Sequence, residues 1–138
     1  MDHRVRNNLT AVLSLASQTA DDSPDLPSFI ASFNSRLKAL AASHDLLSRS
    51  QWSGLKLADA IDKVVRPFVD SKERLCVIGE PVELKARLAT AMCLCLNELS
   101  INAVKHGALS DNHGGSITVE WRRTETRSEE HTSELQSL

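Results

Sequence analysis

The sequence has no marked excess of charge, no long apolar run and no tyrosine. Its 16 Lys and Arg against 18 Asp and Glu give a net charge of -2, which argues against the basic surface of a nucleic-acid partner. With 41% hydrophobic and 25% charged residues, it is too apolar and too evenly charged for a disordered chain. No apolar run approaches the roughly 20 residues that span a bilayer, and no basic-then-apolar leader opens the chain. We therefore expect a cytoplasmic protein without a membrane segment.

Cysteine is scarce, and the three cysteines (Cys76, Cys93 and Cys95) are too few and odd in number for a disulfide framework. Reduced thiols are typical of the cytosol. Cys93 and Cys95 stand two residues apart in a predicted helix, where their side chains point in different directions. We therefore expect them to be small core residues and not metal ligands.

Residues 2–20 predict an amphipathic helix with two stripes. The apolar stripe has the spacing 4, 3, 4 and consists of Val5, Leu9, Val12 and Ala16. The polar stripe beside it consists of His3, Asn7, Thr10, Ser14 and Ser17. His3 and Asn7 lie one turn apart, so their side chains can meet. Taken alone, a histidine at a helix start is usually only a solvated polar residue.

Prolines and acids in residues 21–27 predict a break, and residues 28–50 predict a second helix. Its apolar stripe is Ile30, Phe33, Leu37, Leu40, His44 and Leu47. Two helices joined by a short turn form an antiparallel hairpin with a narrow seam and little core of its own. We expect this hairpin to pair with a second copy as a four-helix bundle, and His44 to be a packed histidine of the seam.

The rest of the chain predicts short elements around one long helix. After a joint at residues 52–54 we expect a helix at 57–70, a strand at 74–78 and a turn at 79–81. The long helix covers residues 83–106, ends at Gly107, and has the core stripe Leu88, Met92, Leu96, Leu99 and Ala103. Residues 116–121 alternate as a half-buried strand, and the sequence after it predicts no partner strand.

Glu98, Asn102 and Lys105 follow the spacing 4 and 3, so they share one face of the long helix. A carboxylate and an amide one turn apart suit Mg²⁺, which keeps several waters and is held by few protein groups together with phosphate oxygens. Taken alone, the spacing is a weak signal and is usually that of a solvated helix face.

Three ordered motifs are similar to those of sensor histidine kinases of the HWE class. They are DHRVRNNL at residues 2–9, RLKALAASHDLL at 36–47 and NELSINAVKHGALS at 97–110. The resemblance implies a mostly α fold with a small β part (α+β). Residues 1–52 would form a dimerisation and histidine phosphotransfer hairpin, and residues 53–126 an incomplete α/β-sandwich ATP-binding domain. The implied partner is the receiver domain of a response regulator.

The resemblance also implies roles for individual residues. His3 resembles the phosphoacceptor that attacks the γ-phosphate of ATP, and its place on the polar stripe leaves it reachable. Asn102 resembles the amide that helps to hold Mg²⁺ against the ATP phosphates, and Glu98 the acid that orients a metal-bound water. Lys105 would contact phosphate as a point charge. Asn7 would orient a water for dephosphorylation of the partner.

Two features depart from the pattern of the class. Asn97 stands where the class has a histidine, and neither a Trp-x-Glu box nor a glycine-rich D-x-G-x-G motif follows the strand that ends at Trp121. We therefore expect an ATP-dependent kinase as the parent, and a fragment that is itself inactive. The alternative is a non-catalytic helical dimer that relays phosphate, or only scaffolds, without binding ATP.

Residues 127–138 resemble the in-frame translation of a short-read sequencing adapter, over the stretch RSEEHTSELQS. The segment has no apolar periodicity, so we expect a non-native, disordered tail. Without it the chain has 15 Lys and Arg and 15 Asp and Glu, so the net negative charge belongs to the tail.

Overall fold

The computed structural model describes residues 2–107, 115–123 and 133–137, with side chains for 6–71, 73–107 and 115–123. The four α-helices are α1 (Asp2–Asp22), α2 (Leu26–Arg49), α3 (Leu57–Val64) and α4 (Ala86–His106). The strands are β1 (Leu55–Lys56), β2 (Leu75–Ile78), β3 (Glu83–Leu84), β4 (Ile117–Arg123) and β5 (Ser133–Ser137). Two short 3-10 helices are η1 (Arg66–Phe68) and η2 (Lys72–Arg74).

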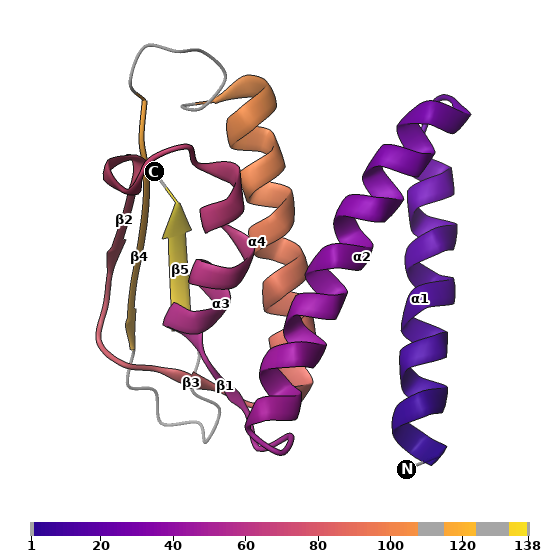
Figure 1. Ribbon diagram of the computed structural model, residues 1–138, viewed down its shortest axis with the longest axis horizontal. Coiled ribbons are helices and arrows are strands. Elements are labelled where there is room, and N and C mark those ends of the chain that lie inside the picture. The colour runs from indigo at the N-terminus through magenta and orange to yellow at the C-terminus, as the bar shows by residue number, and fades with distance from the viewer. Residues whose placement is uncertain (1, 108–114, 124–132, 138) are drawn as a thin grey trace.

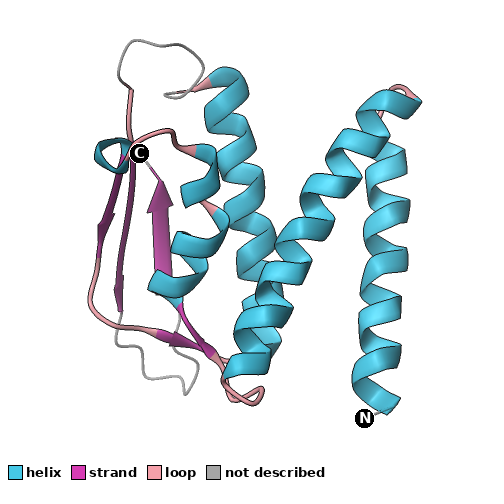
Figure 2. Cartoon of the chain, in the orientation of Figure 1, coloured by secondary structure: helices cyan, strands magenta, loops and turns pink. Residues whose placement is uncertain are grey.

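The described chain is mostly helical with a small β part, as the α+β prediction requires (Figure 2). Figure 1 shows α1 and α2 side by side and antiparallel at one side of the molecule and β2, β4 and β5 at the other, with α3 and α4 between them and β1 and β3 near the C-terminal end of α2. β1 pairs antiparallel with β3, while β4 lies between parallel β2 and antiparallel β5. No described helix is long and apolar enough to cross a membrane.

The turn between α1 and α2 is made by the residues that predicted a helix break. The Asp25 side chain accepts a hydrogen bond from the Ser28 backbone N–H at 2.8 Å, and Pro27 lies in the first turn, where no N–H is needed. This backbone bond favours the ionised carboxylate and lowers the pKa of Asp25. The two predicted helices and the break between them are confirmed, and the residues between the helices are 23–25.

The seam of the hairpin differs from the predicted stripes. In α1 the buried side chains are Leu15 and Thr19, whereas Leu9 of the predicted stripe is 60% exposed. In α2 the buried side chains are Ala39, Ser43 and Leu47, so of the predicted stripe only Leu47 is buried. The reason is that α2 contacts two helices, α1 and α4, and spacing alone does not say which neighbour covers which positions.

His44 is exposed, so its prediction as a packed histidine of the seam is wrong. Its ring meets Trp52 edge-on, with 4.8 Å between the ring centroids. This contact joins the end of α2 to the following turn, where Gln51 and Trp52 both have positive φ. His44 therefore belongs to the surface of the joint and not to the helix seam.

The helices of the second half are shorter than predicted. α3 ends at Val64 and continues as η1, because Pro67 cannot donate the backbone hydrogen bond that an α-helix requires. The predicted long helix begins at Ala86, and the residues before it form β3, with Leu84 opposite Leu55. The predicted strand at 74–78 is confirmed as β2.

The hydrophobic core lies between α3, α4 and the strands. The buried residues of α4 are Ala89, Cys93, Leu96, Asn97 and Ser100, and only Leu96 was in the predicted stripe. Leu88 and Leu99 of the predicted stripe are 45% and 42% exposed. Cys93 is a core residue as predicted, whereas the same prediction for Cys95 is wrong, since Cys95 is exposed.

β4 alternates as predicted, with Ile117, Val119 and Trp121 buried. The indole N–H of Trp121 donates to the Glu80 carbonyl at 2.7 Å, and a Cβ at Gly79 would collide with the indole ring. The prediction that β4 has no partner after it is wrong, because β5 pairs with it along residues 119–123. Strand pairing joins backbone groups, so a segment without apolar periodicity can still supply it.

Candidate functional site

Glu98, Asn102 and Lys105 lie on one face of α4, as their spacing predicted. Asn102 and Lys105 are exposed, and the Glu98 side chain is 45% exposed. The opposite face of α4 is fixed in the core by Ala89 and Cys93, which are completely buried. The core packing therefore presents an acid, an amide and an ammonium group along one rigid helix.

Glu98 is held by Arg36 of α2 through two hydrogen bonds. Arg36 Nε donates to Glu98 Oε2 at 3.2 Å, and Arg36 Nη2 donates to Oε1 at 2.9 Å. This is the bidentate geometry that makes arginine–carboxylate pairs strong. The bonds to Glu98 raise the pKa of Arg36, so the guanidinium is charged throughout the accessible pH range.

The guanidinium of Arg36 joins three helices. Its Nη1 donates to Thr19 Oγ1 of α1 at 2.8 Å, and its Nη2 lies 3.9 Å from a carboxylate oxygen of Asp22. Arg36 is only 18% exposed, so these contacts are partly withdrawn from water. The sequence had one signal for this residue, since Arg36 opens the motif at 36–47, but no role was predicted for it.

Asn97, which stands at the position of the class histidine, is buried and faces α2. Its Nδ2 donates to Ser35 Oγ at 3.1 Å, and Ser35 Oγ lies 3.3 Å from Asn97 Oδ1. The neighbouring residues 35 and 36 of α2 thus bind the neighbouring residues 97 and 98 of α4. In this arrangement Asn97 is a packing residue between two helices.

The structure does not bring His3 to the polar face of α4. His3 lies in the first turn of α1, and its side chain lies outside the described part of the chain. Between His3 and Thr19, which contacts Arg36, α1 rises about 24 Å at the usual helical rise. Asn7, one turn after His3, is exposed and lies about 18 Å along α1 from Thr19. Within one chain, the described arrangement therefore keeps the first turn of α1 far from the residues beside Asn102.

A groove of about 460 Å³ opens beside the Arg36–Glu98 pair. α1 contributes Leu15, Gln18 and Asp22 to it, and α4 contributes Leu94, Cys95, Glu98 and Leu99. The pair therefore lies at the edge of an open, mostly apolar space between the hairpin and α4, and not within the close-packed core.

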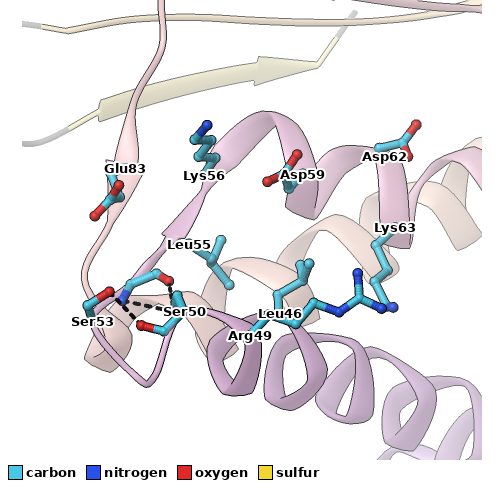
Figure 3. A pocket seen from close by; sticks show the side chains of 11 residues that line it. Leu46, Arg49, Ser50, Ser53, Leu55, Lys56, Asp59, Asp62, Lys63 and Glu83 are labelled. Carbon is cyan, nitrogen blue, oxygen red and sulfur yellow. Dashed lines mark hydrogen bonds between the residues drawn. The ribbon is translucent and has the colours of Figure 1, made fainter.

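A larger cavity of about 530 Å³ lies at the joint between the hairpin and the second half (Figure 3). Its charged lining residues are Arg49, Lys56, Lys63, Asp59, Asp62 and Glu83, three of each sign. The hydroxyl of Ser50 closes the turn beside it by donating to the Gly54 carbonyl. None of the predicted site residues lines this cavity, and its balanced charge favours no class of ligand.

Among the described residues, no three His, Cys, Asp or Glu side chains are grouped to hold a metal ion. The donors on α4 nevertheless fit Mg²⁺ in type, because this ion uses few protein oxygens and completes its shell with water and phosphate. Asn102 offers its amide oxygen at the surface. Glu98 offers a carboxylate only when it is not bonded to Arg36.

Comparison with known proteins agrees with the three motifs. Residues 1–81 match the family described as HWE histidine kinase. The blue-light-activated histidine kinase of Brucella anthropi is 32% identical over 130 residues, which cover 94% of this chain and 26% of that protein. The protein of the same name from Brucella ovis is 33% identical over 128 residues, covering 92% and 26%. The chain thus spans about a quarter of the length of these curated relatives.

Proposed function

The chain belongs to the HWE histidine kinase family, and from that premise we propose that it is part of a sensor histidine kinase that uses ATP and Mg²⁺. Residues 1–52 are the dimerisation and phosphoacceptor hairpin, and residues 53–126 belong to the ATP-binding domain. The observation that carries this proposal is the polar face of α4, where Glu98, Asn102 and Lys105 lie together on a helix fixed in the core.

The proposed reaction is phosphoryl transfer from ATP to His3. An imidazole nitrogen of His3 forms a bond to the γ-phosphorus while the bond from that phosphorus to the bridging oxygen breaks, and ADP leaves. Asn102 would hold Mg²⁺, Lys105 would neutralise phosphate charge, and Glu98 would orient a metal-bound water. Such transfer depends mainly on positioning and charge neutralisation, which is what these side chain types provide.

The proposed partners are a second copy of the chain and a receiver domain. The hairpin leaves four large apolar side chains in solvent, namely Leu9, Leu13, Leu26 and Ile30, which are 49–71% exposed. A second hairpin would cover them as a four-helix bundle. An aspartate of the receiver domain would then take the phosphoryl group from His3, with Asn7 placed to orient water in the reverse, dephosphorylating reaction. We assign these steps to the cytoplasm.

One observation favours the second candidate, a phosphorelay or scaffold module without ATP binding. The carboxylate of Glu98 is bonded to Arg36 in the described arrangement, so it is not free to serve a nucleotide there. A pure relay would need only His3 and the hairpin. It would have no use for the acid and amide on α4, so the kinase remains the better proposal.

A chimera tests the proposed function. Residues 1–126 would replace the matching segment of the Brucella anthropi kinase, and the purified chimera would be incubated with radiolabelled ATP and Mg²⁺. We expect acid-labile label that is lost in His3→Ala and reduced by roughly a hundredfold or more in Asn102→Ala, as for groups that act in the transition state. The 138-residue chain alone should take up little or no label.

The matched control is His44→Ala, which removes an exposed histidine of α2, away from the polar face of α4. It should keep full labelling. Label that persists in His3→Ala, or a folded chimera that takes up none, would contradict the proposed reaction and favour the module without ATP binding.

A further inference from the structure

The hairpin is docked on α4 by an interface of small and polar side chains. Besides the bonds of Ser35 to Asn97 and of Arg36 to Glu98, Ser43 Oγ lies 3.2 Å from Thr90 Oγ1. Two of the buried apolar side chains of these helices are small, Ala39 on α2 and Ala89 on α4. Separation of such a surface exposes little apolar area, and its polar groups regain bonds to water. The interface is therefore suited to reversible docking.

The two halves of α2 are attached to the rest of the molecule differently. Leu47 belongs to the buried core, and Ala42 and Leu46 pack against it. In the described structure the N-terminal half, residues 26–38, contributes no side chain to this core. It is held to α4 by Ser35 and Arg36, and Figure 1 shows α2 leaning away from α4 toward its N-terminal end. The N-terminal half of α2, together with α1, can thus separate from α4 while the C-terminal half of α2 stays anchored in the core.

The Arg36–Glu98 pair competes with a metal-bound water for the same carboxylate oxygens. Both carboxylate oxygens of Glu98 accept from the guanidinium, which carries a full positive charge. A hydrated divalent cation whose water reached these oxygens would lie within several ångströms of that charge, which disfavours its binding. Glu98 therefore serves either the hairpin or the nucleotide site.

We propose that Arg36 is a latch that docks the hairpin on α4 and, while docked, withholds Glu98 from phosphoryl transfer. This inference rests on the proposed function, and it assigns the described arrangement to a resting state. Two independent features agree with it: Glu98 is occupied, and α1 places His3 about 24 Å along its axis from the contact of Thr19 with Arg36. Release of Arg36 would free Glu98 and allow the hairpin to move.

A distance measurement on the 138-residue chain tests the docking without any nucleotide. Cys76→Ser and Cys95→Ser remove the exposed thiols, and spin labels on Ser17→Cys in α1 and Val104→Cys in α4 report the separation of the hairpin. We expect one narrow distance distribution for the parent, and a longer and broader one for Arg36→Gln. Exchanging the charges, with Arg36→Glu and Glu98→Arg together, should restore the narrow distribution.

Arg49→Gln is the matched control, because Arg49 lies on the same helix and pairs with Asp45 of that helix at 3.2 Å. It should leave the distance unchanged. A narrow distribution that is the same in Arg36→Gln and in the parent would overturn the latch.

Labelling of the chimera tests the withholding of Glu98. Arg36→Gln should raise the initial rate of labelling by roughly tenfold, within the range of coupling between two sites. The exchanged pair should stay docked and unlabelled, because it has no carboxylate at position 98. Arg36→Gln could instead open the hairpin and slow labelling as much as Glu98→Gln does. That result would show that Arg36 positions Glu98 for the reaction, and it would overturn the proposal that Arg36 withholds Glu98.

The two proposals fail separately. A chimera that takes up no label in any variant contradicts the proposed function and, with it, the withholding of Glu98. The distance measurement contains no nucleotide, so it still decides whether Arg36 docks the hairpin.

Discussion

Thr19 shows how one buried polar residue fixes a contact between helices. It is completely buried, yet its hydroxyl donates to the Leu15 carbonyl at 2.6 Å and accepts from Arg36 at 2.8 Å. Both capacities of the hydroxyl are used, so its burial leaves no unsatisfied group. Its acceptor position on α1 directs Arg36 toward Glu98. The spacing of apolar residues could not reveal this contact, because Thr19 belongs to no apolar stripe.

The three cysteines should differ sharply in reactivity. Cys93 is completely buried, and burial raises the pKa of its thiol to about 11, whereas Cys76 and Cys95 are exposed. Only the thiolate reacts, and a pKa of 11 leaves a thiolate fraction at pH 8 about a hundredfold smaller than the ordinary value of 9.0. We expect a thiol reagent at pH 8 to modify two cysteines quickly and Cys93 only in denaturant, as followed by mass spectrometry.

Cys93→Ser is the control for that measurement, since it should leave the fast modification unchanged. Equal rates for all three thiols in the folded chain would show that α4 does not bury Cys93 in solution.

At the scale of elements, the sequence predicted where helices and strands lie better than it predicted which of their faces are buried. The helices at 2–20 and 28–50, the strand at 74–78 and the alternation of β4 are all confirmed. The buried faces of α1, α2 and α4 were not predicted, because α2 packs both on α1 and on α4, and α4 is distant from it in sequence. β1 and β3 were also missed, since two-residue strands carry no periodicity.

The pairing of β5 with β4 allows a test of whether residues 127–138, which resemble a translated adapter, are needed for the fold. Parallel β2 pairs with one edge of β4 and β5 with the other, while Ile117, Val119 and Trp121 are buried. Deleting residues 127–138 should therefore leave the fold intact and expose one strand edge, which favours self-association. We expect an almost unchanged far-UV circular dichroism spectrum and light scattering that rises with concentration. Loss of the helical signal would show instead that the segment is part of the native fold.

At the scale of the whole molecule, the hairpin is joined to the second half by the polar interface of α2 with α4 and by the C-terminal half of α2, where Leu47 belongs to the core. The hairpin buries few large side chains of its own: Leu15 in α1 and Leu47 in α2 are its large apolar members in the buried set. The small core of the hairpin and its exposed leucines are both explained by a missing helical partner, which is the physical basis of the proposed dimer.

Leu13→Glu should weaken this dimer strongly. Leu13 is 71% exposed, and burial of a leucine contributes about 1.5–3 kcal/mol. A symmetric dimer contains the residue twice, so the dissociation constant should rise by roughly a hundredfold or more. Ser14→Glu, one position along on the exposed polar stripe, should have little effect. Light scattering coupled to size-exclusion chromatography gives the mass, and a monomeric parent chain would contradict the proposed interface.

The sequence by itself determined the class of the fold, the family and the face of α4 that carries Glu98, Asn102 and Lys105. These properties follow from local spacing and ordered motifs, which consist of residues close to one another in the sequence. The tertiary structure alone decided that Arg36 holds Glu98, that Asn97 packs on Ser35 and that His3 lies far from both. These facts depend on how α2 lies across α4, sixty positions away along the chain, and that arrangement is fixed by packing that no local pattern records.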